Sequence, residues 1–306
     1  MHTLESLRNT IESIEDLRAV VRTMKALAMV SIRQYDQART ALQDYSHSLE
    51  LGIQALLHHR RFAEKDWAGL PLMGTNHRTG KLAIILFGSD HGLCGQFNEQ
   101  VVNYGLQVIQ THSLKPGEYY LATIGDRLLP YLDSARPTNP ETFRLPNSLA
   151  GIPRLIQSLL RLIEQWYFQT QSPPVQKILL VYHHSQSNTL YHPITQQLLP
   201  LDPQWLQAIG DRPWDSNALP RLNGPWQQVF AAMIRQYLFS SLYRATVESL
   251  ASENTARLMS MQAAEKNIEE RLQDLNGDYR QQRQNSITEE LLDIVSGFEA
   301  LKDHSP

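Results

Sequence analysis

Both ends of this chain are long segments without proline in which apolar residues recur every three or four positions. Residues 1–58 contain one glycine, Gly52, and residues 226–302 contain only Gly277 and Gly297. This spacing is typical of a helix that buries one narrow stripe. At 1.5 Å per residue the first helix would be roughly 85 Å long, which is longer than a compact domain needs.

Neither helix is expected to be stable by itself, because most helical stability comes from packing an apolar face. We therefore predict that the segments Leu4–Leu56 and Met261–Leu301 pack antiparallel as one stiff rod. The stripe residues of the first segment are Leu4, Leu7, Ile11, Ile14, Ile32, Tyr35, Ala38, Leu42, Tyr45, Leu49, Ile53 and Leu56. Those of the second are Met261, Ala264, Ile268, Leu272, Leu275, Tyr279, Ile287, Leu291, Ile294, Phe298 and Leu301.

The middle of the chain has a different pattern. Short apolar runs at Lys81–Gly88, Tyr119–Gly125 and Lys177–His183 have the length of buried strands. Helical stretches lie between them, near residues 98–112 and 149–169. This alternation predicts a small, mostly parallel α/β sheet.

The predicted fold class is therefore α/β with a long coiled coil, in which antiparallel N- and C-terminal helices form a rod around an inserted Rossmann-like domain. The segment after the third strand is rich in proline and tryptophan, which favours an irregular connection. The expected division is a helix over 1–58, a linker over 59–80, the inserted α/β domain over 81–200, the connection over 201–224 and a second helix over 225–302.

Composition excludes several classes of function. A formal charge of −3 argues against a nucleic-acid partner, which normally requires a basic surplus. The longest apolar run, Leu82–Phe87, is far shorter than the roughly 20 residues that cross a bilayer. With no visible signal peptide, we expect a cytoplasmic protein without direct membrane insertion, held at any membrane by another subunit.

No cofactor, metal or catalytic residue is expected. The loop Ser89–Asn98 contains glycines between a strand and a helix, but it matches neither common phosphate-binding pattern. The single cysteine, Cys94, excludes a disulfide framework and is expected to be inert packing. His183, His184 and His192 lack carboxylates or cysteines at ligand spacing, which favours solvated or hydrogen-bonding histidines over a metal site.

Two polar features of the terminal helices have two interpretations each. Arg18, Arg22 and Lys25 share one helix face, which is either a solvated face steadied by Glu15 and Asp16 or a basic stripe for an acidic partner. A polar band that includes Arg283, Gln284 and residues 288–290 interrupts the second apolar stripe. That band is either ordinary surface or a contact with a partner.

Four motifs go beyond such general features. Glu248–Met259 and Tyr279–Glu290 strongly resemble the hallmark sequences of the gamma subunit of F-type ATP synthases. Ser89–Asn98 resembles that family's middle-domain signature, and Arg22–Val30 is similar to its N-terminal motif. Residues 113–225 match the family only in their general residue pattern and contain none of the four motifs. The motifs occur in the family's order, which makes coincidence improbable.

The resemblance implies a rotor shaft inside a ring of alternating alpha and beta subunits, with the epsilon subunit and the membrane c-ring as further partners. Catalytic nucleotides would belong to the ring subunits, so this chain would not be an enzyme in itself. Its expected location is peripheral, at the cytoplasmic face of the bacterial plasma membrane or at the thylakoid membrane. By residue matching, the contacts with the alpha/beta ring would come from Arg18, Arg22, Met24, Lys25, Arg257, Gln284, Thr288 and Glu290.

Some residues depart from the family's usual pattern. His91 stands where arginine is commoner, Glu289 where glutamine is frequent, and Phe298-Glu299 where small residues are usual. These departures suggest a divergent branch, such as the sodium-translocating bacterial type, but leave open whether protons or sodium ions are coupled. Two other hypotheses are a non-rotary coiled-coil scaffold or adaptor, and a nucleotide-binding enzyme built on the α/β insert.

Overall fold

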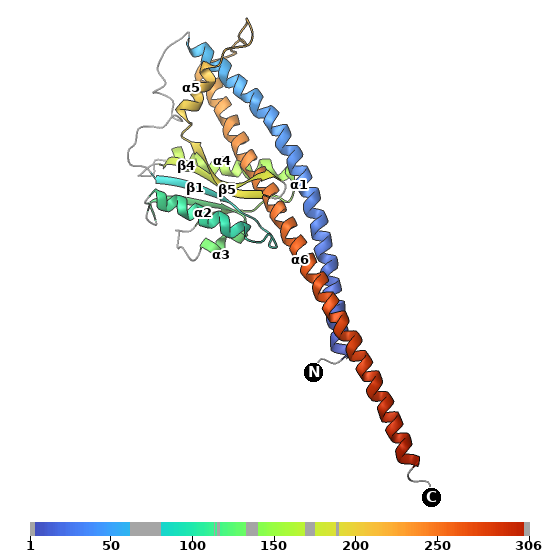
Figure 1. Cartoon of the computed structure of the whole chain (residues 1–306). Coiled ribbons are helices and arrows are strands. Elements are labelled where there is room, and N and C mark those ends of the chain that lie inside the picture. The colour runs from blue at the N-terminus through green and yellow to red at the C-terminus, as the bar shows by residue number, and fades with distance from the viewer. Residues whose placement is uncertain are drawn as a thin grey trace. The chain divides into compact units, whose positions relative to one another are not determined.

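The computed structural model describes residues 4–61, 81–112, 114, 117–132, 140–168, 175–187 and 190–302 (Figure 1). The chain divides into two compact units. Residues 1–27 with 258–306 form what we call the coil unit, and residues 28–257 form the sheet unit. The predicted linker over 59–80 lies outside the described residues from position 62 onward.

The two long helices predicted from the termini are present and contribute to both units. Helix α1 spans Leu4–Arg61 and helix α6 spans Trp226–Lys302. In the sheet unit they run antiparallel, since Tyr45 Oη donates to Gln236 Oε1 at 3.0 Å and Trp226 Nε1 donates to the Leu56 carbonyl at 2.9 Å. Among the described helices, none has a stretch long and apolar enough to span a bilayer.

The same two helices form an apolar seam in the coil unit. Val21 of α1 is buried with Met261, Ile268 and Leu272 of α6. Because 3.6 residues make a helical turn, positions three and four apart return to one face, and this is why the stripe meets its partner there. The seam is flanked by the partly buried residues Ile11, Ile14, Met24 and Ala264.

The prediction that the second segment packs alongside the first as far as Leu301 was wrong for its described distal part. Ile287, Leu291 and Ile294 are 49%, 57% and 68% exposed. Paired antiparallel helices advance by the same rise per residue. Because the described part of α1 begins at Leu4, it covers the turns of α6 that come before these exposed residues and not the turns that contain them. Side chains from residue 297 onward are outside the description.

The sheet has five strands in the order β3-β2-β1-β4-β5. All neighbours are parallel except β4 and β5, which are antiparallel. The three predicted strands are confirmed as β1, β2 and β4, whereas β3 and β5 were not predicted. The strands span Lys81–Phe87 (β1), Tyr119–Ile124 (β2), Glu141–Phe143 (β3), Val175–Ser187 (β4) and Leu190–Leu199 (β5).

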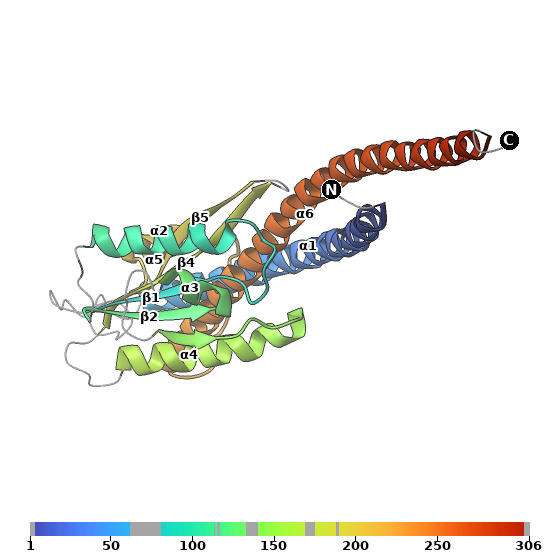
Figure 2. The ribbon, with the colours of Figure 1, turned by 90° about the horizontal axis from the view of Figure 1, so that it is seen from below.

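Helices cover both faces of the sheet (Figure 2). Alternate side chains of a strand point to opposite faces, so Leu82, Ile84 and Leu86 of β1 pack with α2 and α3. The intervening residues of β1 pack with α4 and with the sheet-unit parts of α1 and α6. The helices are α2 (Phe97–Thr111), α3 (Leu129–Leu132) and α4 (Ile152–Phe168), with short 3₁₀ turns at Asp126–Leu128 and Leu149–Gly151.

Helix α5, Pro203–Asp211, corrects the prediction of an irregular connection over 201–224. Asp202 caps this helix, because its Oδ1 accepts from the Gln204 backbone N–H at 2.9 Å. Proline at the first helical position loses no intrahelical hydrogen bond. The helix then buries Leu206 and Ile209 in the core of the sheet unit.

The turn after β2 depends on a glycine. Gly125 has φ +104°, and an added Cβ would lie 2.7 Å from the backbone N of Ser89. Gly117 has a similar φ of +94° but open space around it.

We expect Gly125→Ala to cost about 3 kcal/mol or more of unfolding free energy and Gly117→Ala about 1–2 kcal/mol, since only the first adds a clash to the backbone strain. Urea unfolding of the full chain measures both; equal losses would contradict the clash.

Candidate functional site

Two of the sequence motifs meet in the sheet unit, where α6 contacts the loop between β1 and α2. The guanidinium of Arg257 connects them. Its Nη2 donates to the carbonyl oxygens of Gly92 at 3.4 Å and His91 at 3.5 Å. The same nitrogen donates to Glu253 Oε1 at 2.7 Å, and Nη1 donates to Asn254 Oδ1 at 3.3 Å. Arg257 therefore joins the loop to the helix; we call this contact the joint.

The ion pair of the joint is buried. The side chain of Arg257 is 13% exposed and that of Glu253 is 6% exposed. Burial raises the pKa of the Glu253 carboxyl, and the charge and hydrogen bond of Arg257 act in the opposite direction. Glu253 Oε2 has no hydrogen-bond partner among the described residues. Arg257 is therefore the main described group that favours the charged form of this carboxyl against the cost of its burial.

A second set of bonds fixes the loop internally. Asn98 Oδ1 accepts from the Ser89 backbone N–H at 2.9 Å, and Asn98 Nδ2 donates to Ser89 Oγ at 2.8 Å. The thiol of Cys94 lies 3.6 Å from both side chains. Burial raises the pKa of that thiol, which disfavours the reactive thiolate. The arrangement agrees with the packing role that the sequence favours for Cys94.

Asp90 ties the loop to the neighbouring strands. Its two carboxylate oxygens accept from the backbone N–H groups of Asp126 at 3.0 Å and Leu145 at 2.9 Å. These donors follow β2 and β3, whose carboxyl ends lie at the same edge of the parallel sheet. The loop is thus attached to the sheet by Asp90 and to α6 by Arg257.

The histidines near this edge serve packing and hydrogen bonding. The ring of His183 stacks on Phe97 with centroids 4.3 Å apart, and Tyr191 approaches it edge-on at 5.2 Å. Burial lowers the pKa of His183 to about 3, so this ring is neutral at ordinary pH. His184 Nδ1 lies 2.6 Å from Glu248 Oε2 on α6. Within the described residues, no group of three potential ligands could hold a metal ion.

The predicted basic stripe lies in the coil unit. Arg22 Nε donates to Glu265 Oε1 at 2.8 Å, and Lys25 Nζ donates to Glu265 Oε2 at 2.8 Å. A longer contact of 3.4 Å joins Arg22 to Glu269. The acidic partners described for these two cations therefore come from α6, not from residues 15 and 16 of α1. Arg18 is half-buried on the same helix.

The other predicted contact residues differ in exposure. Gln284, Thr288 and Glu290 are exposed on α6, and Thr288 Oγ1 donates to the Gln284 carbonyl at 2.8 Å. Met24 is half-buried and packs against the apolar seam. Arg257 belongs to the sheet unit and is largely enclosed by the joint. These three residues of the polar band are thus open to a partner, whereas the exposed Arg22 is already paired with Glu265.

Sequence reasoning missed Glu253 as part of the joint and Asp90 as the residue that attaches the loop to the strands. Glu253 stands four residues before Arg257, and this spacing places the two side chains on one helix face. That spacing was an available signal for the ion pair. No comparable signal indicates that Asp90 binds two backbone groups, because its partners are 36 and 55 residues away in sequence.

The whole chain has known relatives. Residues 3–301 match the ATP synthase family. Two similar curated proteins are the ATP synthase gamma chains of a Cyanothece species and of a Sulfurovum species. Each is 26% identical to this chain and aligns over 99% of this chain and 100% of its own length.

Solved structures share the fold. A chain in the Euglena gracilis mitochondrial ATP synthase, from a structure of OSCP, F1 and the c-ring, matches with a TM-score of 0.65 and 17% identity, covering 99% of this chain and 96% of its own. A chain from the central stalk and c-ring of the Tetrahymena thermophila enzyme matches with a TM-score of 0.55 and 16% identity. It covers 80% of this chain and 99% of its own.

The buried ion pair of the joint leads to a prediction about the free energy of unfolding. Because Arg257→Ala leaves a buried carboxylate without its partner, we expect a loss of about 3–5 kcal/mol in unfolding free energy. Adding Glu253→Gln to that variant should recover part of the loss. Arg235→Ala, which breaks an exposed pair with Glu164, should cost at most about 1 kcal/mol. Urea unfolding compares the three variants, and similar losses for Arg257→Ala and Arg235→Ala would rule out a buried joint.

The ion pairs of Glu265 in the coil unit lead to a prediction about how the thermal stability depends on pH. Hydrogen bonds from Lys25 and Arg22 lower the pKa of Glu265 below its usual 4.5. A lowered folded-state pKa contributes stability above the unfolded value, and this contribution disappears as the pH falls through the folded value. We expect Glu265→Gln to lower the thermal midpoint at pH 7, with the difference from the parent chain vanishing in acid below pH 4.5.

The matched control for Glu265 is Glu270→Gln. Glu270 pairs with Lys266 on its own helix at 3.9 Å, and both side chains are well exposed. This variant should change the midpoint less at pH 7, because exposed pairs within one helix contribute little. Melting followed by circular dichroism at several pH values provides the test. A difference between Glu265→Gln and the parent chain that persists unchanged at low pH would count against the assignment.

Proposed function

Because the chain belongs to the ATP synthase family, we propose that it is the central rotor shaft of an F-type ATP synthase, in the position of the gamma chain. One observation carries this conclusion: alignment with curated gamma chains extends over 99% of this chain and 100% of theirs. The antiparallel α1 and α6, with a sheet formed by the sequence between them, agree with that role. The chain is a non-catalytic subunit.

The proposed partners are the alpha and beta subunits of the head, the epsilon subunit and the membrane c-ring. Support comes from the two solved structures of similar fold, one of OSCP, F1 and the c-ring and the other of a central stalk with its c-ring. The chain therefore belongs to the peripheral part of the complex. We further propose that this part lies at the cytoplasmic face of a bacterial plasma membrane or at a thylakoid membrane.

The proposed surface for the alpha/beta ring keeps the eight residues indicated by the resemblance. Gln284, Thr288 and Glu290 support it best, since their exposed polar side chains can form and break hydrogen bonds as the shaft turns. A hydrogen bond to a charged group contributes about 1.5–3 kcal/mol, which biases one orientation without locking it. The other five are Arg18, Arg22, Met24, Lys25 and Arg257, of which the last four also have contacts within this chain.

The shaft role also sets a mechanical requirement for the sheet unit. If ions turn the c-ring, the part of the chain seated on that ring must not rotate about α6. We propose that the joint at Arg257 and the bond between His184 and Glu248 prevent such slippage in the sheet unit. Both contacts connect α6 with segments that belong to the sheet and its loops. The expected division into two coiled-coil helices and an inserted domain over 81–200 remains part of the proposal.

Assembly and turnover test this function together. A tagged chain expressed in its own cells should co-purify with alpha and beta subunits in one complex that hydrolyses ATP. Gln284→Ala with Thr288→Ala should then slow hydrolysis about tenfold or more, because transient contacts with the ring are lost. Gln262→Ala with Gln273→Ala, which alters exposed amides outside the polar band, should leave turnover unchanged.

The outcomes are separable. Recovery of the native chain only as a free monomer would overturn the shaft proposal. Normal assembly with unchanged turnover in the Gln284/Thr288 variant would instead remove the polar band from the ring-facing surface. A comparable loss in the control pair would indicate a general effect on α6, again contradicting a specific band.

A further inference from the structure

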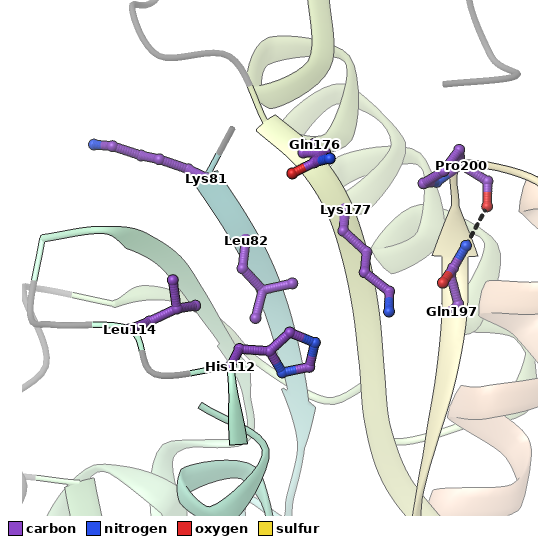
Figure 3. Close-up of a pocket in the computed structure, with 8 residues that line it drawn as sticks. All are labelled: Lys81, Leu82, His112, Leu114, Gln176, Lys177, Gln197 and Pro200. Atoms are coloured by element: carbon purple, nitrogen blue, oxygen red, sulfur yellow. Dashed lines mark hydrogen bonds between the residues drawn. The ribbon is translucent and has the colours of Figure 1, made fainter. Parts of the chain in front are cut away.

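The two ends of the sheet differ in how they arrange charged groups. At the amino-terminal ends of β1 and β4 lies a pocket of about 400 Å³, but its two lysines point apart (Figure 3). Lys81 Nζ lies 4.7 Å from the ring centroid of Tyr120, away from Lys177. At the carboxyl-terminal ends of the parallel strands, by contrast, charged groups of the loop and of α6 converge on Glu253.

The carboxyl group of Glu253 has few interactions for a buried charge. Glu253 is 4% exposed, and its Oε1 accepts from Arg257 Nη2 at 2.7 Å. Its Oε2 is buried without a hydrogen-bond partner in the described part of the chain. An ionised carboxylate can accept about four hydrogen bonds, and a buried charge costs free energy unless such bonds replace those to water. The burial of this carboxylate is therefore only partly compensated.

The other groups around Glu253 do not complete this compensation. Burial raises the pKa of Glu253 more than the charge and hydrogen bond of Arg257 lower it. Asp90 raises this pKa further and His91 lowers it, both less than burial does. The charged form of Glu253 therefore has a net cost in the folded chain. The titratable groups that interact electrostatically with Glu253 from other elements are Tyr35 of α1 and Asp90, His91 and Cys94 of the loop.

The position of Arg257 depends on this carboxylate. Nη2 of Arg257 forms its short bond with Glu253. The contacts of the same atom with the carbonyl oxygens of His91 and Gly92 are 3.5 Å and 3.4 Å long. Short charge-assisted bonds are the strong ones, and an arginine side chain has several rotatable bonds that must be ordered. Glu253 is thus the group that holds the guanidinium where it reaches the loop.

We propose that Glu253 is a positioning residue of the shaft, whose charge lowers the stability of the chain but holds Arg257 against the loop. In the proposed function, on which this role rests, the joint stops the sheet unit from slipping about α6. Residues that cost stability concentrate where function needs a defined geometry. An apolar contact of similar volume is often neutral or more stable than a buried ion pair, but it has no preferred direction.

Melting of the full-length Glu253→Gln variant tests the cost of the charge. Glutamine keeps the shape and an oxygen for Arg257 but has no charge to bury. Because the folded-state pKa is raised, the parent chain loses stability as the pH rises from the usual 4.5 through the folded value. The midpoint of the variant relative to the parent should therefore rise between pH 4.5 and neutral pH. Glu265→Gln, which replaces a carboxyl with a lowered pKa, should show the opposite trend.

Hydrogen exchange at neutral pH tests the positioning role. The backbone N–H groups of Ser89 and Asp126 donate to side chains of the loop, Asn98 and Asp90. In Glu253→Gln we expect these two amides to exchange about tenfold faster, corresponding to one lost charge-assisted contact. The faster exchange is local, because the same substitution removes a charge that costs the whole chain stability.

Two variants provide controls. Asp90→Asn weakens the attachment of the loop to the strands and should also speed the exchange. Glu164→Gln removes the exposed partner of Arg235, a pair that joins α4 to α6, and should leave the exchange unchanged. In membrane vesicles that contain the assembled complex, Glu253→Gln should lose part of the ion transport per ATP hydrolysed, whereas Glu164→Gln should not.

Three results would overturn this role for Glu253. The first is a relative midpoint of Glu253→Gln that fails to rise with pH, since the charge would then have no net cost. The second is exchange at the parental rate, or equal acceleration by Glu164→Gln. The third is unaltered ion transport per ATP hydrolysed by the assembled variant. Melting and exchange need no ring subunits, so failure of the parent chain to assemble would overturn the shaft proposal and leave these two measurements standing.

Discussion

The antiparallel packing of α1 on α6 is the interaction on which both units depend. In the coil unit it buries Val21 against Met261 and Ile268. In the sheet unit, residues of the same two helices, such as Ile53 and Phe230, belong to the core that also contains one face of the sheet. One face of the sheet therefore shares its core with the two long helices, whereas the other face packs with α2 and α3. Loss of the helix pairing would expose apolar surface in both units, with no other described helix long enough to replace it.

Polar groups determine how the sheet unit is attached to this pair. A buried ion pair is weak support for stability, because removing two charges from water offsets much of their attraction. Its value lies in specificity: Arg257 can satisfy Glu253 and the loop carbonyls only when the loop has one position on α6. Asp90 fixes the other side of that loop to two strands. A shaft that transmits torque needs such a directional attachment, which apolar packing by itself does not provide.

The sequence predicted the parts of the fold that have a strong period or a continuous apolar run. β1, β2 and β4 are such runs, whereas β5 has polar residues and Pro193 within it, as an edge strand can. β3 has only three residues, too few for a pattern. Helix α5 was hidden by the prolines and tryptophans in and after it, although Asp202-Pro203 is a standard start signal. For the candidate site, the motifs predicted that Arg257 contacts the alpha/beta ring, and this stays a prediction; its contact with the chain's own loop was not foreseen, because the loop is about 165 residues away in sequence.

Periodicity also has a limit that the distal part of α6 illustrates. An apolar stripe in the sequence predicts that one face of a helix will be buried, but it does not indicate which partner covers that face. Met261 and Leu272 are covered by α1, while Leu291 and Ile294 continue the same stripe and are exposed. Exposed apolar residues that continue a buried seam indicate a binding surface. In the proposed shaft, the ring would supply this cover, with the polar band at Gln284 and Thr288 between the two regions. An apolar contact has no preferred direction and permits rotation, whereas the proposed contacts of the polar band would favour particular angles.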